Sequence, residues 1–355
     1  MQRPATIIDV ANTAGVSTAT VSRVINGGLV KESTKRLVEE TIERLGYRRN
    51  GLARGLVTGR TGFIGVLVPD ITGPLYAQLA RGIEDILEPR AMNYLMVTDN
   101  RDVYQERQSI ALLIERQIDT LIIIGSQLSE AELDKLVPED IPVVLVQREQ
   151  DEARRLQRFS RVEIDNRVAV EEIVDYLVAL GHKRIAHVAG TRREGMLREQ
   201  VFKERLTHHG LEALAFLRSS DSQGDENTGI KAAASVLDLI EKEQLSAVFC
   251  ANDRIAVGLY HALQQEGIAI PETLSVVGFD DLPWSRYLHP PLTTVRQDAR
   301  AMGQKAAIAS LEMLSAVGGG TQNILLPTEL IYRSSVTKLL AASPREVLAP
   351  KGGDW

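Results

Sequence analysis

Small hydroxyl-bearing and basic side chains are concentrated near the start of the chain, between Ser17 and Asn26. The apolar residues of this segment recur at helical spacing, which leaves the other positions on the exposed face of a short helix. Such side chains can approach base edges and phosphates in the major groove of DNA. We expect base contacts from Thr18 and Ala19, and a base or phosphate contact from Arg23. The other candidates would bind phosphate or cap helices: Ser17, Thr20, Ser22 and Asn26.

Two further helices are expected to hold this helix in place. Thr6 can cap a first helix together with Asp9, as in a capping box, and we also count Thr6 among the candidate DNA contacts. Gly15 suits the positive φ that ends a helix. Two short helices joined by a glycine turn and braced by a third predict an all-α helix-turn-helix domain. The third helix should run from about 31 to 45 and bury Leu37, Val38, Ile42 and Leu45.

The charge of the chain is unevenly distributed. Residues 1–60 carry ten Lys or Arg and five Asp or Glu, whereas the net charge of all 355 residues is −6. A basic N-terminal segment joined to an acidic remainder indicates that the basic segment binds a polyanion. Charge alone leaves open that the difference is a chance fluctuation over a short segment.

Composition and motifs argue against several other classes of protein. The single cysteine, Cys250, excludes an internal disulfide and fits a reducing cytosol, where we expect it to lie in a buried strand. No apolar run approaches the roughly 20 residues of a membrane span, and we see no signal-peptide core. Dinucleotide, P-loop and zinc-protease motifs are absent from the sequence, and the His208–His209 pair has no third ligand nearby. We therefore expect a cytoplasmic protein with no catalytic residues, no metal and no cofactor.

After residue 61, apolar strands alternate with amphipathic helices, which predicts α/β folding with parallel sheets. Two such halves would bind a ligand between them, at the carboxyl ends of their strands. The expected strands are 62–68, 94–98, 121–125, 142–146, 161–164, 184–189, 247–250 and 274–278, and the expected helices are 74–87, 103–116, 129–136, 166–180, 194–209 and 252–266.

Taken together, these motifs closely resemble the lactose-repressor (LacI/GalR) family. The similarity is densest over Thr6–Ala11, Ala14–Ser17 and Thr20–Asn26, and it continues through Val68–Tyr76 and Val277–Asp281. It implies that the α/β part has a periplasmic-binding-protein-like fold of two parallel-sheet subdomains, with three crossings between them. The implied divisions are a helix-turn-helix domain at 1–48, a hinge helix and linker at 49–61, an effector and dimerisation domain at 62–337, and a tail at 338–355. Within the effector domain, the N-subdomain would take about 62–162 and 293–326, and the C-subdomain about 163–291 and 327–337.

The resemblance also implies a hinge that contacts DNA. Leu56 matches the family's leucine, which inserts into the minor groove, and Ala53 matches a position where paired hinges pack. Asn50 and Arg54 complete the candidate hinge contacts, while Arg49 replaces the proline that the family usually has. Glycines within this short segment weaken a helix, so we expect the hinge to fold on DNA.

Candidate effector residues follow from the resemblance and from strand ends. Asn252, Asp253 and Asp165 could contact ligand or merely cap helices, and Trp284 could stack on a sugar or fill the core. Several arginines favour an anionic or polyhydroxylated ligand, such as a sugar, sugar acid or sugar phosphate. The full set of candidates is Leu75, Tyr76, Arg148, Asp165, Arg198, Asn252, Asp253, Asp280 and Trp284.

The sequence therefore predicts a transcription regulator, expected to be a repressor, that a small-molecule effector controls. Its partners would be pseudo-palindromic double-stranded operator DNA, the effector and a second copy of the chain, with no membrane. A sugar-binding transport protein and an enzyme on the same α/β body are the alternatives. A transport protein would have no use for residues 1–60, and a turnover assay would address an enzyme.

Overall fold

The computed structural model describes residues 5–25, 27–47, 60–148, 158–218, 224–315 and 320–339. The chain divides into two compact units, Met1–Gly62 and Phe63–Trp355, so the division lies beside the predicted start of the effector domain. None of the helices in the described ranges is both long enough and apolar enough to cross a membrane.

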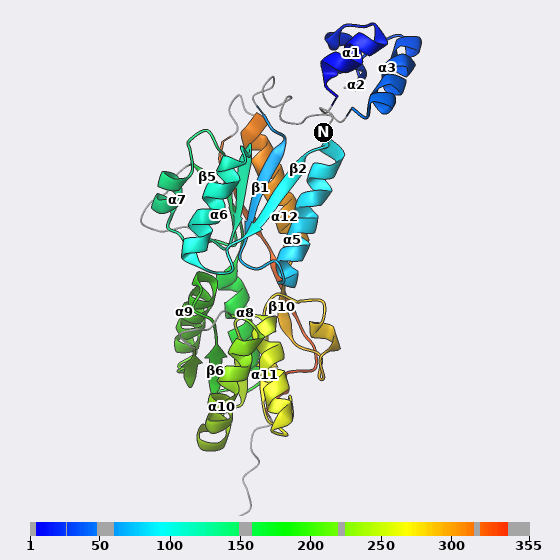
Figure 1. The fold of residues 1–355 in the computed structure, drawn as a ribbon. Coiled ribbons are helices and arrows are strands. Elements are labelled where there is room, and N and C mark those ends of the chain that lie inside the picture. Colours follow the sequence, from blue (N-terminus) through cyan, green and yellow to red (C-terminus); the bar gives the residue numbers. More distant parts are fainter. Residues whose placement is uncertain are drawn as a thin grey trace, which may run out of the picture. The chain divides into compact units, whose positions relative to one another are not determined.

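The first unit is a three-helix domain (Figure 1) made of α1 (Ile7–Ala14), α2 (Thr18–Ile25) and α3 (Glu32–Leu45). The predicted capping box is confirmed, because the Thr6 backbone N–H donates to Asp9 Oδ2 at 2.8 Å and the Asp9 N–H donates back to Thr6 Oγ1. Gly15 ends α1 with φ of +63°, as the turn requires. The core of the unit is formed by Val10, Ala11, Ala14, Val21, Val24 and Val38.

One prediction about this core is wrong. Leu37 is 45% exposed, whereas Thr41 is buried and donates from Oγ1 to the Leu37 carbonyl at 2.7 Å. Val38 and Thr41 are three residues apart, so they share one helix face and turn Leu37 toward solvent. The other two members of the predicted stripe, Ile42 and Leu45, pack at the margin of the core.

The second unit contains two parallel sheets, which confirms the predicted fold class. One half is a six-stranded sheet in the order β11-β5-β4-β3-β1-β2, and the other is a four-stranded sheet in the order β7-β6-β8-β9. A two-stranded antiparallel pair, β10 and β12, runs between the halves (Figure 1). The strands are β1 (Phe63–Val68), β2 (Asn93–Thr98), β3 (Thr120–Ile124), β4 (Val143–Val146), β5 (Phe159–Ile164), β6 (Ile185–Val188), β7 (Ala215–Leu217), β8 (Ala247–Cys250), β9 (Ser275–Val277), β10 (Thr294–Gln297), β11 (Asn323–Leu326) and β12 (Thr328–Ile331).

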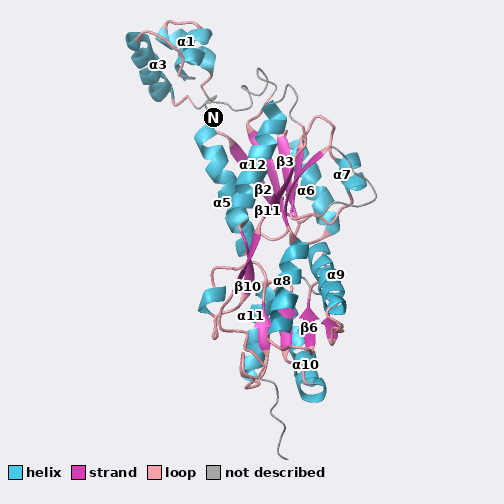
Figure 2. Ribbon diagram, turned by 180° about the vertical axis from the view of Figure 1, so that it is seen from behind, coloured by secondary structure: helices cyan, strands magenta, loops and turns pink. Residues whose placement is uncertain are grey.

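Helices cover both sheets (Figure 2). The larger sheet has α5 (Pro74–Leu87), α6 (Val103–Glu115), α7 (Glu130–Leu136) and α12 (Ala299–Ser315) around it. The smaller sheet has α8 (Asn166–Ala179), α9 (Arg193–His208), α10 (Glu226–Glu243) and α11 (Asp253–Gln265). Two short 3-10 turns are η1 (Glu88–Arg90) and η2 (Ser285–Tyr287).

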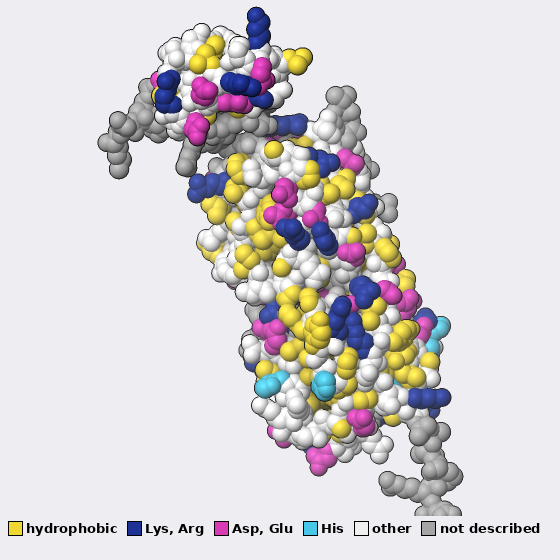
Figure 3. All heavy atoms as spheres, turned by 90° about the vertical axis from the view of Figure 1, so that its right-hand side faces the viewer, with side chains coloured by type: hydrophobic (Ala, Val, Ile, Leu, Met, Phe, Trp, Pro, Cys, Tyr) yellow, Lys and Arg dark blue, Asp and Glu magenta, His cyan; other side chains and the backbone are white. Residues whose placement is uncertain are grey.

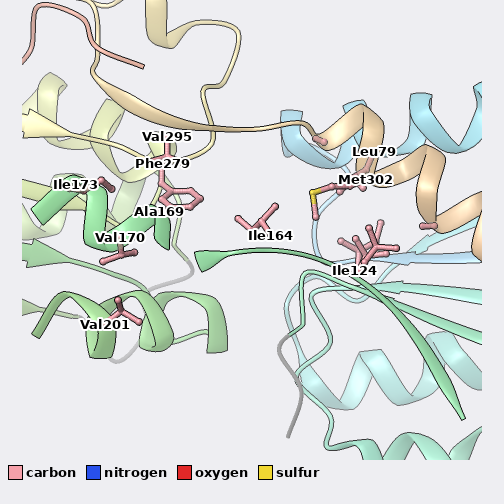
Figure 4. Close-up of a cluster of buried hydrophobic side chains, with 14 of the residues drawn as sticks. Leu79, Ile124, Ile164, Ala169, Val170, Ile173, Val201, Phe279, Val295 and Met302 are labelled. Carbon is pink, nitrogen blue, oxygen red and sulfur yellow. The ribbon is translucent and has the colours of Figure 1, made fainter. Parts of the chain in front are cut away.

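The described chain passes between the halves at three places, after β5, at β10 and between β11 and β12. Apolar side chains from both halves meet along these crossings in one buried cluster (Figure 4). Ile164, at the end of β5, lies between Phe279 of one half and Met302 of the other. The crossings therefore join the halves through packed core, and this core fixes the strand ends that face each other.

Helices α5 and α12 approach each other unusually closely in the larger half. A Cβ placed on Gly303 would lie 2.0 Å from the Leu79 carbonyl oxygen, and one on Gly82 would lie 2.0 Å from the Arg300 carbonyl oxygen. Helix α5 has the bounds predicted from the sequence, whereas α12 was not predicted. The reason is that α12 buries mainly alanines, glycine and serine, which give little apolar periodicity.

We predict that Gly303→Ala destabilises the protein although alanine is the better helix former. Alanine gains about 1 kcal/mol of helix propensity, but its Cβ meets backbone that cannot move without separating two packed helices. The free energy of unfolding, measured by urea denaturation, should fall by at least about 2 kcal/mol. Gly320→Ala is the matched control, because a Cβ there meets no atom within 4 Å. Equal stability of the two variants would contradict this account of the packing.

Candidate functional site

The exposed face of α2 carries the predicted DNA-contacting side chains. Thr18, Ala19 and Arg23 are exposed, and Val21 and Val24 are buried on the opposite face. Ser17 Oγ accepts the Thr20 backbone N–H at 3.1 Å and bonds the Thr20 hydroxyl at 2.9 Å, so both residues cap the helix in this state. The helix N-terminus adds backbone N–H groups that suit a phosphate.

Several of the predicted DNA-contacting residues either lie off the exposed face of α2 or fall outside the described residues. Thr6 is engaged in the capping box, and Ser22 is half-buried beside the exposed face. The remaining candidates lie outside the described residues: Asn26, Asn50, Ala53, Arg54 and Leu56. Basic side chains are visible on the surface of the first unit, interspersed with acidic ones (Figure 3).

A cavity lies between the two halves of the second unit, at the carboxyl ends of their strands. We call it the effector cavity; it encloses about 710 Å³ of space, part of which is open to solvent. Its walls come from the larger half, the smaller half and the connecting strand β10, as expected for ligand sites in open α/β sheets. The lining residues are Gly73, Pro74, Leu75, Tyr76, Arg101, Gln147, Gly190, Arg192, Glu194, Gly195, Arg198, Gly224, Ala251, Asn252, Arg254, Asp280, Leu282 and Gln297.

Arg198 is a buried cation with a fixed position in this cavity. It is only 6% exposed, and its Nε donates to Asn166 Oδ1 at 3.0 Å while Nη1 donates to the Ala251 carbonyl at 2.6 Å. Its guanidinium lies 3.5 Å from the centre of the Phe279 ring, in a cation–π arrangement. Because folding has already oriented the group, it can bind a ligand without a further ordering cost.

Asp280 supplies an acidic group to the same cavity. Burial raises the pKa of its carboxyl to about 7, although the nearby Arg198 acts in the opposite direction. Gln297 Nε2 donates to Asp280 Oδ1 at 2.5 Å, and Gln147 Nε2 donates to Gln297 Oε1 at 2.8 Å. Near neutral pH this carboxyl can therefore either donate or accept a hydrogen bond with a ligand hydroxyl.

Asn252 also lines the cavity, with its amide held on both sides. Its Oδ1 accepts the Ile255 N–H at 2.9 Å, which caps α11, and its Nδ2 donates to the Gly224 carbonyl at 2.9 Å. Leu75 and Tyr76 contribute an apolar wall from the first turn of α5. The structure thus brings five of the predicted effector residues to one cavity: Leu75, Tyr76, Arg198, Asn252 and Asp280.

The other four candidates do not line the effector cavity. Asp253 is fully buried, and its carboxylate accepts the Thr294 hydroxyl at 2.6 Å, the Leu282 N–H at 2.8 Å and the Ser285 hydroxyl. Asp165 caps α8 by accepting the Val168 N–H at 3.0 Å. The Asp165 contact is the helix cap that the sequence left open, whereas Asn252 and not Asp253 caps α11. Asp253 instead joins α11 to β10 and to the loop before η2. Trp284 lies just before η2 with a buried indole nitrogen, and Arg148 lines a neighbouring cavity.

Some lining residues were not predicted from the sequence. Gln147 directly follows β4, and Arg101 lies three residues after the end of β2, so the rule that ligands bind at carboxyl strand ends could have found them. Arg254 gave no such signal, because it lies inside the first turn of α11 and reaches the cavity only through the packing of the two halves. Among the described residues, no group of three or more metal-ligating side chains is placed to hold a metal.

Polar contacts cross the cleft near the cavity. Arg254 of the smaller half donates to Asp70 of the larger half at 2.9 Å while it pairs with Glu226 at 2.7 Å. Burial alone would raise the pKa of Asp70, but hydrogen bonds from Thr72 and Arg254 bring it down to about 2. Arg192 Nη2 donates to the Gly125 carbonyl across the same cleft at 2.7 Å. These contacts hold the halves together in the state described.

Comparison with known proteins decides the family. The model for bacterial regulatory proteins of the lacI family matches residues 6–50, and a periplasmic binding protein-like domain matches residues 174–336. Catabolite control protein A from Priestia megaterium is 34% identical over 335 residues, covering 93% of this chain and 98% of that protein. The chain belongs to the LacI family. It is a DNA-binding transcription regulator, and its resemblance to this family is confirmed.

Solved structures agree with this assignment. The Lac repressor dimer bound to operator and the anti-inducer ONPF matches with a TM-score of 0.80 and 26% identity, covering 94% of this chain and 100% of that chain. The complex of the transcriptional regulator CelR with cellobiose matches with a TM-score of 0.68 and 27% identity, over 94% of this chain and 100% of that chain. Each of these two matches spans 94% of this LacI-family chain and so includes residues of both units.

We predict that the buried carboxyl of Asp280 makes the stability of this regulator fall as pH rises. A carboxyl whose pKa is about 7 when folded, against about 4 when unfolded, binds its proton more tightly in the folded state. Its contribution to stability is therefore fully present at low pH and is lost between those two values. Asp280→Asn removes the titration, so its free energy of unfolding should rise relative to that of the wild type between about pH 4 and about pH 7.

Thermal melts across that range measure the difference. Asp140→Asn, at an exposed turn position, is the control for removing a carboxylate without burial. A difference between wild type and Asp280→Asn that does not change with pH would show that the carboxyl does not titrate as described.

Proposed function

We propose that this LacI-family regulator is a cytoplasmic homodimeric repressor without catalytic activity, controlled by a sugar, sugar acid or sugar phosphate in the effector cavity. The observation that carries the proposal is that two groups line the same cavity. One is the fixed guanidinium of Arg198, and the other is the carboxyl of Asp280, which can donate or accept a hydrogen bond near neutral pH. Polyhydroxylated ligands present adjacent donors and acceptors, and this pair matches both kinds of group.

The walls of the cavity support this class of ligand. Leu75, Tyr76 and Leu282 offer apolar surface to the carbon faces of a sugar ring, and Asn252 offers an oriented amide. Arg101 and Arg192 add guanidinium groups that could bind a carboxylate or phosphate. We propose that Asp165 and Asp253 position the walls instead of contacting the effector, because neither lines the effector cavity and both accept hydrogen bonds within the protein.

Control of DNA binding would pass through the closure of the cleft. An effector shifts an equilibrium only by its different affinity for the two states. The Asp70–Arg254 and Arg192–Gly125 contacts exist only when the halves are close, so an effector that strengthens or displaces them changes the population of the closed state. We propose that closure alters the spacing of the paired hinges, in which Asn50, Ala53, Arg54 and Leu56 meet the operator.

The DNA-binding part of the proposal predicts a strong effect of Arg23→Ala. Arg23 is exposed on α2, so its removal should leave the fold intact and lower operator affinity by about 1–3 kcal/mol, with relaxed sequence preference if it reads a base. Fluorescence anisotropy of the full chain with operator and with scrambled DNA measures both quantities. Arg44→Ala removes the same charge from exposed α3 and is the matched control. Unchanged affinity and preference in Arg23→Ala would refute the assignment of α2.

The effector part predicts that a ligand from this class raises the melting temperature of the full chain, because it binds the native state. A panel of sugars, sugar acids and sugar phosphates should contain at least one such compound, and that compound should also change operator affinity. Arg198→Lys keeps the charge but loses the planar donor set, so the thermal shift should be lost while operator binding persists. A panel without any shift, or a shift retained in Arg198→Lys, would argue against the proposed site.

A further inference from the structure

The loop that follows β3 receives the smaller half at one edge of the cleft. We call residues 125–127 the docking loop. The Gly125 carbonyl accepts a hydrogen bond from Arg192 Nη2 at 2.7 Å, and Gln127 Oε1 accepts the backbone N–H of Arg193 at 3.3 Å. Both hydrogen bonds join the larger half to the segment where α9 begins, so they can form only when the two halves are close.

The docking loop lies so near α9 that it has no room for a side chain at Gly125. Gly125 has φ of +61°, which favours glycine. A Cβ placed there would lie 3.0 Å from Glu194 Oε1 and 3.2 Å from Arg192 Nη2. The contacts across the cleft therefore depend on the backbone conformation of the loop, and a residue that fixes this conformation influences whether the halves can meet.

Glu106, on α6, fixes the docking loop from inside the larger half. The residue is only 1% exposed, and its Oε2 accepts the backbone N–H of Gln127 at 3.1 Å while its Oε1 accepts the Ser126 hydroxyl. Gln127 Nε2 in turn donates to the Gly125 carbonyl at 3.0 Å. One buried carboxylate thus holds two residues of the loop directly and the third through Gln127.

The charge of Glu106 also acts across the cleft. Burial raises the pKa of its carboxyl, whereas hydrogen bonds from the docking loop and the positive charges of Arg192 and Arg148 lower it. Burial also raises the pKa of the nearby Asp99 to about 6, and Arg192 acts against that increase as well. The guanidinium that bonds to the docking loop is therefore attracted by the carboxyl groups beneath that loop.

We infer that Glu106 is a positioning residue for closure of the cleft, because its carboxylate fixes the docking loop in the conformation that binds Arg192 and Arg193. This inference rests on the proposed function, in which closure controls DNA binding. Glu106 does not line the effector cavity, so it acts on the closed state through the protein and not through the effector. A carboxylate accepts hydrogen bonds on both oxygens, and an amide of the same shape replaces one of these acceptors by a donor.

Double electron–electron resonance of the full chain without effector measures the position of the halves. Nitroxide labels at Lys135→Cys on α7 and Lys203→Cys on α9 occupy exposed positions, one in each half, and the native Cys250 is buried. Dilution of the labelled chain into an excess of unlabelled chain removes distances between copies. The distance distribution then gives the ratio of closed to open molecules.

Glu106→Gln should lower the ratio of closed to open molecules at least about fivefold, the effect of losing one net hydrogen bond. Glu115→Gln is the matched control, because it removes the same charge from an exposed position at the end of the same helix and should leave the ratio unchanged. Melting temperatures check that each variant folds.

A double variant shows whether Glu106 acts through the docking loop. Gln127→Leu removes the acceptor of the Arg193 N–H directly and should also lower the ratio. Glu106→Gln combined with Gln127→Leu should lower it no further than the stronger single change, because residues that act through one shared contact are not additive.

Each outcome has a distinct meaning. A wild-type ratio in Glu106→Gln, when Gln127→Leu lowers it, overturns the inference and leaves the proposed function standing. A lower melting temperature with a wild-type ratio also overturns it, since Glu106 would then only stabilise the larger half. Effects that multiply in the double variant overturn the assignment to the docking loop. A wild-type ratio in every variant overturns the inference together with the proposed role of these contacts in closure.

Discussion

The burial of one positive charge, the guanidinium of Arg198, imposes a strict condition on the centre of the second unit. Removing an ion from water costs several kcal/mol unless the protein replaces the lost hydrogen bonds. Here the replacements come from three different segments: Asn166 at the start of α8, the Ala251 carbonyl after β8, and the Phe279 ring after β9. These segments must converge for Arg198 to be buried, so the walls of the cleft and the position of the cation are fixed together.

The same region shows how two carboxyl groups come to have different uses. Asp253 accepts hydrogen bonds from Thr294, Leu282 and Ser285, and these tie α11 to the loop before η2 and to β10. Asp280 faces the cavity, where Gln297 donates to it and the positive charge of Arg198 lowers its pKa against the larger effect of burial. One carboxyl is committed to holding the fold, and the other is placed to meet a ligand. Hydrogen-bond partners and access to the cavity, and not residue type, decide between these roles.

The two halves are linked by core packing at the crossings and by polar contacts at the cleft, and these differ in strength and reversibility. The apolar cluster around Ile164 is continuous between the halves, whereas Asp70–Arg254 and Arg192–Gly125 are polar contacts near solvent. The side chains of Arg254, Asp70 and Arg192 are only partly exposed, and opening of the cleft would exchange these contacts for water. A packed pivot with exchangeable polar contacts at its opening is the arrangement that a switch between open and closed states needs.

Local interactions allowed much of the architecture to be predicted from the sequence. Features that depend on residues a few positions apart can be predicted from the sequence pattern. Examples are the capping box of Thr6 and Asp9, the turn at Gly15 and the bounds of α5. Leu75, Tyr76, Arg198, Asn252 and Asp280 were brought to one cavity as expected, because carboxyl ends of parallel strands meet. Helix α12 escaped prediction because its face of small residues follows from contact with α5 and not from periodicity. The position of Arg254 in the cavity wall and the separate roles of Asp253 and Asp280 were decided only by tertiary structure. Each depends on which distant segments supply hydrogen-bond partners and walls, and that information exists only once the two halves have packed together.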